Sequence, residues 1–414
     1  MKVIPSRSFA IASVLGLGAA ACSAAAPGSP YPGGGAANTD SDSGLPEDVV
    51  TVPLARCATP VISDLGVNGP IYTAKVTLGG SQTFDMLVDT GSPEMLVASS
   101  SCNDCTRASP LFTPGATSVD LHRTDSMIYG AGDLAGELYT ENAQVGGAPT
   151  VPVNLLAVTN SAGFFGSQNV LCDSDQGILG LATPLPGESD YFEQLVGLRG
   201  VPDIFTVGLC DTAGSLWLGG YDPSAATGSP QFTPMDDSGG YTIQLTGVAV
   251  AGTALSVPST SYGSAIVDTG DPLLRLPGDL FQAATAAIAS NAEFQRLFGG
   301  ADWFSSTTQP PSCAGSGMTA AQLDTSLPTL TLTFGSGPSI SVEARATSSY
   351  LQAQNSGGTA LWCPGLAPQG STCAGSGGFS CPSEALIGDA FLRSSIVVFD
   401  RQNNRMGFAP HRCP

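Results

Sequence analysis

Two stretches of the chain, FDMLVDTG at residues 84–91 and SAIVDTG at residues 264–270, end in the same tripeptide after an apolar run. Short apolar runs bounded by turn sequences are typical of β-strands. A single Asp-Thr-Gly has an ordinary explanation, because an Asp side chain often caps the backbone of its own turn. Two copies suggest instead that two strands deliver two carboxylates, Asp89 and Asp268, into matching turns.

The repetition extends beyond the tripeptide. A Tyr-Thr pair precedes each copy, at residues 72–73 and 241–242, and a glycine-containing apolar run follows each, GILGL at 177–181 and ALIGD at 385–389. Self-similarity over so long a period indicates two structural units of related fold. We expect an N-terminal lobe over residues 61–235 and a C-terminal lobe over residues 236–414, each with one Asp-Thr-Gly.

The composition favours a mostly β fold. The 414 residues include 52 Gly and 31 Pro, and only 12% are charged. This composition predicts many short strands and turns. Two helices are expected, one at residues 190–198 and one at residues 279–290, the second with Asp279 as its N-cap.

The charge of the chain argues against a nucleic-acid partner. The formal net charge is -20, and Lys75 is the only lysine after the N-terminal segment. Binding to a phosphate backbone depends on clustered Lys and Arg side chains. We therefore expect no nucleic acid among the partners.

The first residues have the character of an export signal. Lys2 and Arg7 precede an apolar stretch over residues 9–21 that is too short to span a bilayer comfortably. Residues 1–21 are therefore expected to be a signal peptide. Residues 22–60 follow and contain few large apolar side chains in their first part, so we expect a flexible tether there.

The end of the signal, AAAC at residues 19–22, allows two interpretations. It suits a small-residue signal-peptidase site, or a bacterial lipobox whose Cys22 becomes lipid-modified. Exported proteins tend to pair their cysteines, and setting Cys22 aside leaves an even number of the eleven. This parity favours the lipoprotein, although a lipobox more usually has Leu where Ala19 stands. We expect an exported protein, secreted or held in a bacterial cell envelope, whose membrane contact is only a lipid on Cys22.

Paired carboxylates suit the hydrolysis of an amide. The reaction needs a base that activates a water and an acid that polarises the carbonyl and protonates the leaving nitrogen. Two carboxyls within hydrogen-bonding distance titrate in two separated steps, so over a range of acidic pH one is ionised and the other protonated. The glycine after each Asp-Thr lets the backbone turn sharply and approach its counterpart.

With these motifs the chain resembles the pepsin-type aspartic endopeptidases over nearly all of residues 61–414. The segment SMIYGAG at residues 126–132 resembles the flap hairpin of that family, in which Tyr129 would close over the substrate. The most specific match is IGDAFLR at residues 387–393, continued by VVFDR at 397–401 and NRMGFA at 404–409. Several motifs in the family's order make chance similarity a poor explanation.

The resemblance implies a bilobal fold of two pseudo-symmetric, β-barrel-like lobes, with an active-site cleft that holds an extended peptide between them. It implies roles for the following residues: Asp89 and Asp268 as the catalytic pair, Gly91, Tyr129, Gly130 and Gly270 as substrate contacts, and Thr90, Ser92, Thr269 and Asp271 as supports of the active site.

The resemblance also implies disulfides, which fit an oxidising compartment. The close pair Cys102 and Cys105 resembles a small loop of the family after the first turn. Further pairs are implied as Cys210 with Cys413, Cys313 with Cys363, and Cys373 with Cys381, which leaves Cys57 with Cys172.

The sequence does not contain the residue patterns of a zinc site, a serine-histidine hydrolase or a phosphate-binding loop. The only histidines, His122 and His411, have no ligand partners at zinc spacing and are expected on the surface. No Gly-x-Ser-x-Gly turn accompanies them, and a phosphate-binding glycine loop is absent from the sequence. We expect neither a metal nor a cofactor.

The sequence departs from the family pattern in three features. Asp271 stands where the family usually has a hydroxyl or small residue. If Asp271 is ionised, it should raise the pKa values of Asp89 and Asp268; if it is protonated, it can donate a hydrogen bond to Asp268. We expect the protonated form. Leu96 replaces a tryptophan that binds the flap tyrosine in many members, which leaves the hydroxyl of Tyr129 without a predicted partner.

Residues 23–55 contain no Lys or Arg, so no basic prosegment of the pepsin kind is expected there.

The leading hypothesis is a monomeric acid endopeptidase that cuts peptide or protein substrates. The alternative is a catalytically silent, pepsin-like binding module on the cell surface, which Asp271 would favour. Both Asp residues and both Thr-Gly pairs are intact, and this favours the enzyme.

Overall fold

A computed structural model describes residues 49–413 except the following segments: 58–60, 63–66, 130–131, 167–170, 173–174, 185–189, 237–239, 306–312, 336, 357–358 and 370–383. The predicted sites Cys22, Gly130, Cys373 and Cys381 lie outside the described residues.

Most of the described residues lie in β-strands, as predicted. In that part of the chain one sheet has 13 strands, in the order β13 (Gln231–Pro234), β25 (Arg405–Pro410), β24 (Ser395–Asp400), β11 (Ile204–Leu209), β12 (Ala213–Leu218), β1 (Val50–Arg56), β4 (Tyr72–Leu78), β5 (Gln82–Asp89), β10 (Gly177–Gly180), β6 (Met95–Ala98), β9 (Val151–Asn160), β8 (Gly132–Val145) and β7 (Val119–Tyr129).

A second sheet belongs to the later part of the chain. It has the order β19 (Ile340–Ala344), β18 (Leu330–Phe334), β14 (Thr242–Val250), β16 (Gly263–Val267), β23 (Ala385–Ile387), β17 (Leu274–Leu276) and β22 (Leu366–Pro368), with β15 (Thr253–Ala254) beside β14. Two separate pairs are β2 (Val61–Ile62) with β3 (Val67–Asn68) and β20 (Leu351–Ser356) with β21 (Thr359–Pro364).

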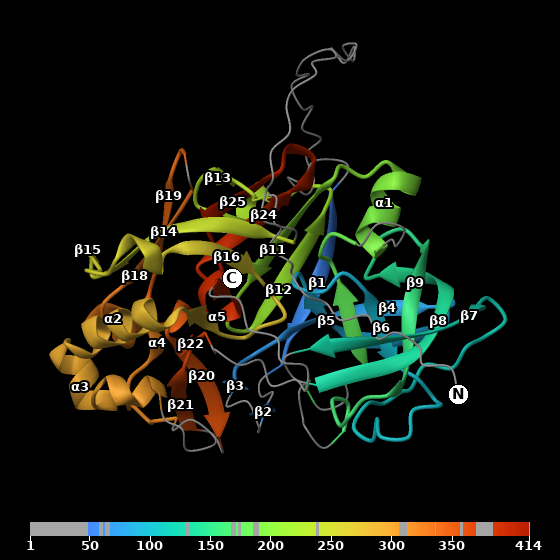
Figure 1. Ribbon diagram of the computed structural model, residues 1–414, viewed down its shortest axis with the longest axis horizontal. Coiled ribbons are helices and arrows are strands. Elements are labelled where there is room, and N and C mark those ends of the chain that lie inside the picture. Colours follow the sequence, from blue (N-terminus) through green and yellow to red (C-terminus); the bar gives the residue numbers. More distant parts are fainter. Residues whose placement is uncertain are drawn as a thin grey trace, which may run out of the picture.

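The molecule is bilobal (Figure 1). Strands of the first half lie on the right in blue to green, and those of the second half lie on the left with the helices α2 (Gly278–Ala289) and α3 (Ala292–Phe298) at the outer edge. The last strands of the chain return to the first sheet, where β24 pairs antiparallel with β11. At this junction the rings of Phe205 and Phe399 stack with centroids 4.5 Å apart.

The sequence repeat corresponds to a repeated arrangement of strands. In the first lobe β10 runs parallel to β5, with Gly180 opposite Asp89. In the second, β23 runs parallel to β16, with Ile387 opposite Val267. The repeated motifs therefore place both Asp-Thr-Gly turns at equivalent strand ends.

The helices agree only partly with prediction. The first, α1 (Tyr191–Arg199), begins after its N-cap Asp190, whose carboxylate accepts from Glu193 N at 2.5 Å. The second is α2, but its N-cap is Pro277 and not Asp279, which lies in the first turn, one residue beyond the helix start. The short helices α3, α4 (Ala320–Ser326) and α5 (Asp389–Leu392) were not predicted from the sequence.

The predicted tether over residues 22–60 extends too far. Residues 50–56 form β1, which pairs with β12 and β4 and buries Val52 and Leu54. The alternation of buried and exposed residues along this strand explains why it joins the sheet.

Four of the implied disulfides are present: Cys57 with Cys172, Cys102 with Cys105, Cys210 with Cys413, and Cys313 with Cys363.

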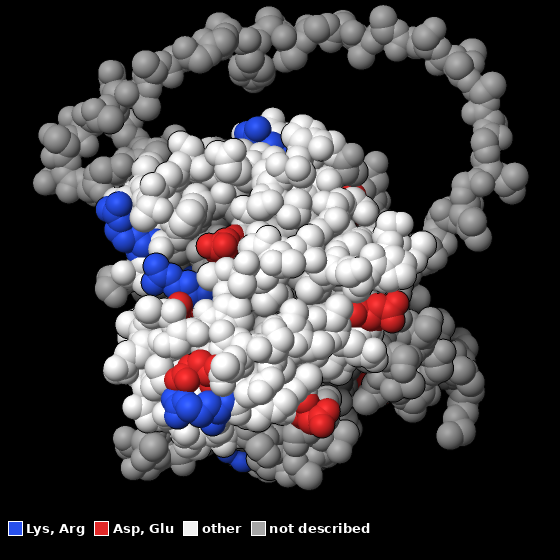
Figure 2. Space-filling view, turned by 90° about the vertical axis from the view of Figure 1, so that its left-hand side faces the viewer, with Lys and Arg blue, Asp and Glu red and all other residues white. Residues whose placement is uncertain are grey.

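The surface in Figure 2 is mostly uncharged, and the few basic side chains on this face do not merge into a broad patch. Within the described part of the chain, no helix combines the length and the apolar character needed to cross a membrane.

Candidate active site

The two Asp-Thr-Gly turns are bound to each other by their threonines. Thr90 N donates to Thr269 Oγ1 at 3.1 Å, and Thr269 N donates to Thr90 Oγ1 at 3.0 Å. Each hydroxyl also donates to the strand of the opposite lobe, Thr90 to Val267 O at 2.9 Å and Thr269 to Val88 O at 2.6 Å. Both threonines are buried. Four reciprocal bonds thus fix the positions of the two turns.

This arrangement brings each Asp carboxyl against the glycine of the opposite turn. A Cβ atom placed on Gly91 would lie 2.7 Å from the carboxyl carbon of Asp268, and one on Gly270 would lie 2.6 Å from that of Asp89. No real side chain tolerates such a contact, so only glycine fits at either position. The sequence prediction that Asp89 and Asp268 come together agrees with this geometry.

The two carboxyls have different hydrogen-bond donors. Asp89 accepts from Gly91 N at 2.8 Å and from Ser92 Oγ at 2.5 Å. Asp268 accepts from Gly270 N at 2.7 Å. Only the first turn has a hydroxyl three residues after its Asp.

Because their surroundings differ, the pKa values of Asp89 and Asp268 are shifted to different extents. Burial raises the pKa of Asp89, but hydrogen bonds from Ser92, Gly91 and Asp268 oppose that rise. Burial, and then the charges of Asp89 and Asp271, raise the pKa of Asp268 well above its usual range. Because the two groups are coupled, one proton is shared. The stronger rise at Asp268 and the hydrogen bonds that oppose the rise at Asp89 both favour Asp268 as the protonated member.

Asp271 does not act as the sequence analysis expected. Its carboxylate forms an ion pair with Arg275, with Nε to Oδ2 at 2.5 Å, and also accepts from Leu273 N at 2.8 Å. The predicted hydrogen bond from a protonated Asp271 to Asp268 is therefore wrong, because the carboxyl turns to the guanidinium instead.

Sequence reasoning gave no role to Asp389, which is fully buried at the start of α5. Neither carboxyl oxygen has a hydrogen-bond partner among the described residues. Burial and then the charge of Asp268 raise the pKa of Asp389 well above its usual range, with Arg393 acting in the opposite direction. Asp389 is therefore protonated and neutral under acidic conditions.

The flap is the hairpin of β7 and β8. Tyr129, at the end of β7, packs against Phe164 with ring centroids 5.9 Å apart, and its hydroxyl lies 3.9 Å from Met127 Sδ. Burial and then the charge of Asp89 raise the pKa of Tyr129, while a hydrogen bond with Ser92 lowers it. The phenol thus lies beside the first turn, and the buried Leu96 offers it no polar group.

A cavity of about 60 Å³ lies beside the flap. It is formed by residues after the first turn, by the flap and by the strand behind it: Pro93, Glu94, Met95, Leu121, Arg123, Asp125, Met127, Leu138, Asn154, Leu155 and Leu156.

Among the residues that the structure describes, two groups of side chains come close enough to hold a metal, judged by distance alone: Cys210, His411 and Cys413, and Cys102, Asp104 and Cys105. In both, the two cysteines form a disulfide, which removes the thiolates that a metal would need.

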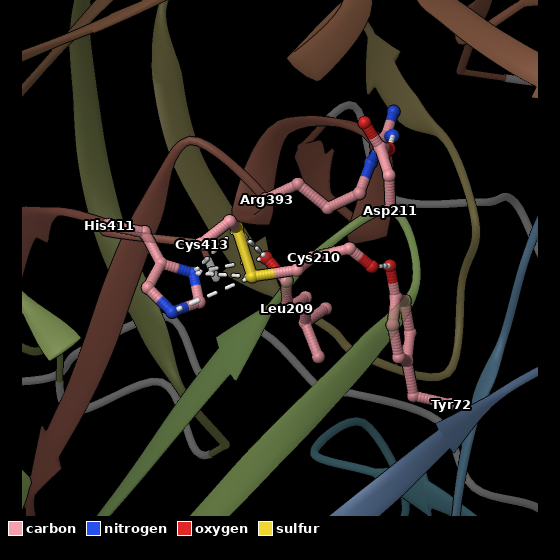
Figure 3. The surroundings of a disulfide bond; sticks show 7 residues. All are labelled: Tyr72, Leu209, Cys210, Asp211, Arg393, His411 and Cys413. Carbon is pink, nitrogen blue, oxygen red and sulfur yellow. Dashed lines mark hydrogen bonds and ion pairs between the residues drawn. A yellow bond between two sulfur atoms is a disulfide. The ribbon is translucent and has the colours of Figure 1, made fainter.

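The histidine in the first group is not the surface residue that the sequence suggested (Figure 3). His411 is half-buried, its Nδ1 lies 3.6 Å from Cys210 Sγ and 3.1 Å from Leu209 O, and burial lowers its pKa. His122 is exposed, as expected.

The chain matches a known family over most of its length. The family described as eukaryotic aspartyl protease matches residues 71–411, a region that includes both turns, the flap and α5.

Individual relatives agree with this match. The chain is 33% identical to an aspartic protease of Phaffia rhodozyma over 84% of this chain and 78% of the relative. It is 28% identical to a beta-secretase of Strongylocentrotus purpuratus, over 83% and 67% respectively. It is 29% identical to pepsin A of Callithrix jacchus, over 80% and 78%.

Proposed function

Because the chain belongs to the aspartyl protease family and is an aspartic-type endopeptidase, we propose that it cleaves extended peptides at acidic pH with a water held between Asp89 and Asp268. The observation that carries this proposal is the reciprocal bonding of Thr90 and Thr269, which holds the two carboxyls at the junction of the lobes.

The unequal surroundings of the carboxyls give each one a role. Asp89, ionised and stabilised by Ser92, is the base that takes a proton from the attacking water. Asp268, which carries the shared proton, donates to the carbonyl oxygen of the scissile bond. After the water has added, Asp89 passes the proton that it took from the water to the leaving nitrogen, a hydroxyl of the tetrahedral intermediate returns its proton to Asp268, and the C–N bond breaks. The two carboxyls together then again hold one proton.

The substrate lies in the cleft as an added strand under the flap, with Tyr129 above it and Gly91 and Gly270 below. The preferred cleavage position is between bulky apolar residues, as the family resemblance implies. The enzyme works as a monomer.

The direct test is cleavage of a peptide library between pH 3 and pH 7, with and without pepstatin, an inhibitor of aspartic peptidases. The proposal predicts cleavage at acidic pH that pepstatin abolishes. Cleavage that pepstatin leaves unchanged would show that another site is responsible.

The maturation of the chain is a separate part of the proposal. Residues 23–55 contain no basic residue that could pair with the acidic cleft, so we infer that protein starting at residue 23 is active without further trimming. Purified protein of this kind that stays inert until it is shortened would contradict the inference.

We also propose that residues 1–21 are a lipoprotein-type export signal of the bacterial kind and that Cys22 carries the lipid anchoring the enzyme in the cell envelope. The support is the AAAC sequence and the even number of remaining cysteines. Mass spectrometry of the mature N-terminus tests this. An unmodified Cys22, or an N-terminus beyond it, would point to a secreted form.

A further inference from the structure

The second turn carries an ion pair at the position where the first turn carries a hydroxyl. Ser92, three residues after Asp89, donates to that carboxylate. Asp271, three residues after Asp268, instead accepts from Arg275 Nε. Two turns of matching backbone therefore give their catalytic carboxyls opposite neighbours, a hydrogen-bond donor in one lobe and a negative charge in the other.

The ion pair is held in place by the surrounding backbone. Arg275 is the middle residue of β17, between the buried side chains of Leu274 and Leu276. On the other side, Asp271 O accepts from Asp389 N at 2.9 Å. The side chains of Arg275 and Asp271 are only 21% and 16% exposed. A charge pair this enclosed is screened little by solvent.

The charged groups around Asp268 come from each element packed against it. The first turn contributes Asp89, and the second turn contributes Asp271 with Arg275 bound to it. The α5 side contributes Asp389, which is neutral under acidic conditions, and Arg393, whose charge lowers the pKa of Asp389. After burial and the charge of Asp89, the charge of Asp271 is the next cause that raises the pKa of Asp268.

We propose that Asp271, held in place by Arg275, is a positioning residue that keeps the shared proton of the active site on Asp268 and extends peptide cleavage toward neutral pH. The inference rests on the proposed function. Cleavage needs Asp268 protonated, so the upper pH limit of activity is the pH at which Asp268 loses its proton. A fixed negative neighbour makes that loss less favourable and moves the limit upward.

The test compares pH profiles of kcat/KM for the wild-type enzyme, Asp271→Asn, Arg275→Gln and the double variant. Asp271→Asn leaves a net positive charge and should move the basic limb down by about one pH unit. Arg275→Gln leaves a net negative charge and should move the limb up. The double variant is neutral again and should fall between the two single variants.

Two further variants serve as an alternative substitution and as a control. Asp271→Thr gives the second turn a hydroxyl like that of Ser92 and should also lower the basic limb, which keeps the proposal testable if Asp271→Asn does not fold. Glu293→Gln breaks an exposed ion pair of similar length with Arg296, 2.6 Å, on α3 at the outer edge of the molecule (Figure 1). It should leave the profile unchanged.

The outcomes separate this inference from the proposed function. If the wild-type enzyme shows no pepstatin-sensitive cleavage, the proposed function itself fails. If the wild type is active but the variants lower kcat/KM equally at every pH, the pair is only structural and the inference is overturned. A basic limb that moves up in Asp271→Asn would also overturn it, because that result fits a protonated Asp271.

Discussion

Thr90 and Thr269, one from each lobe, each accept a hydrogen bond from the backbone N–H of the other, at 3.1 Å and 3.0 Å. The two bonds join the lobes at the residue that follows each Asp carboxyl in the sequence. The relative position of Asp89 and Asp268 therefore depends on the folding of both lobes together, and damage to this contact should affect stability and activity at once.

The first prediction concerns Thr90→Ala. It removes the acceptor of Thr269 N and the donor to Val267 O, and unpaired buried polar groups cost about 1–3 kcal/mol each. We expect the free energy of unfolding to fall by about 2–4 kcal/mol, measured by urea denaturation at pH 4. Thr90→Ser keeps the hydroxyl and should recover most of this loss. Equal loss in the two variants would mean that the methyl group, and not the hydroxyl, stabilises the junction.

Ser92→Ala tests the ionised state of Asp89. The Ser92 hydroxyl lowers the pKa of Asp89, so its removal should raise that pKa and move the acid limb of kcat/KM to higher pH, by roughly half to one unit. Ser118→Ala is the matched control, because Ser118 Oγ donates to Glu141 Oε2 at 2.5 Å, and Glu141 is not among the active-site groups. An acid limb that stays in place in Ser92→Ala would argue against Asp89 as the base.

The buried carboxyl of Asp190 should make the free energy of unfolding depend on pH. Its carboxylate is buried 3.8 Å from Arg401 Nη1, and burial raises its pKa to about 7 in spite of that cation. Unfolded Asp ionises near pH 4, so the folded state holds a proton that the unfolded state has lost. The contribution of Asp190 to stability should therefore be fully present below about pH 4 and should be lost between about pH 4 and pH 7, by up to about 4 kcal/mol.

The variant Asp190→Asn checks this, because Asn resembles the protonated side chain and still caps a helix. It should match the wild type at pH 4 and exceed it at pH 7 in urea unfolding with pepstatin present. Glu293→Gln, at an exposed ion pair, should not produce this difference. Parallel stability profiles for Asp190→Asn and the wild type would rule out Asp190 as the titrating group.

The positions of the two Asp-Thr-Gly turns could be predicted from the sequence because their motifs are local. Each Asp-Thr-Gly follows its own strand, and the second motif of each lobe, at Gly180 and at Gly388, repeats the pattern. The β1 strand was missed although its residues alternate between buried and exposed, since Pro53 and the acidic segment before it resemble a tether. The helix α4 also had a signal, because Thr319 and Gln322 form a capping box.

The partner of Asp271 could not be predicted in the same way. Whether a carboxyl four residues before an arginine binds that arginine or the neighbouring Asp268 depends on side-chain rotamers and on the register of β17 against β23 and β22. The half-buried position of His411 depends likewise on the pairing of Cys210 with Cys413, residues from distant parts of the chain (Figure 3).

The most direct test of the central claim is kcat/KM of Asp89→Asn and of Asp268→Asn at the wild-type pH optimum, on proteins shown to unfold at the wild-type urea concentration. Each substitution removes one member of the acid–base pair and keeps the shape of the side chain. We predict that each lowers kcat/KM by at least about 10³-fold. Either variant retaining activity within about tenfold of the wild type would contradict the assignment of Asp89 and Asp268 as the catalytic pair.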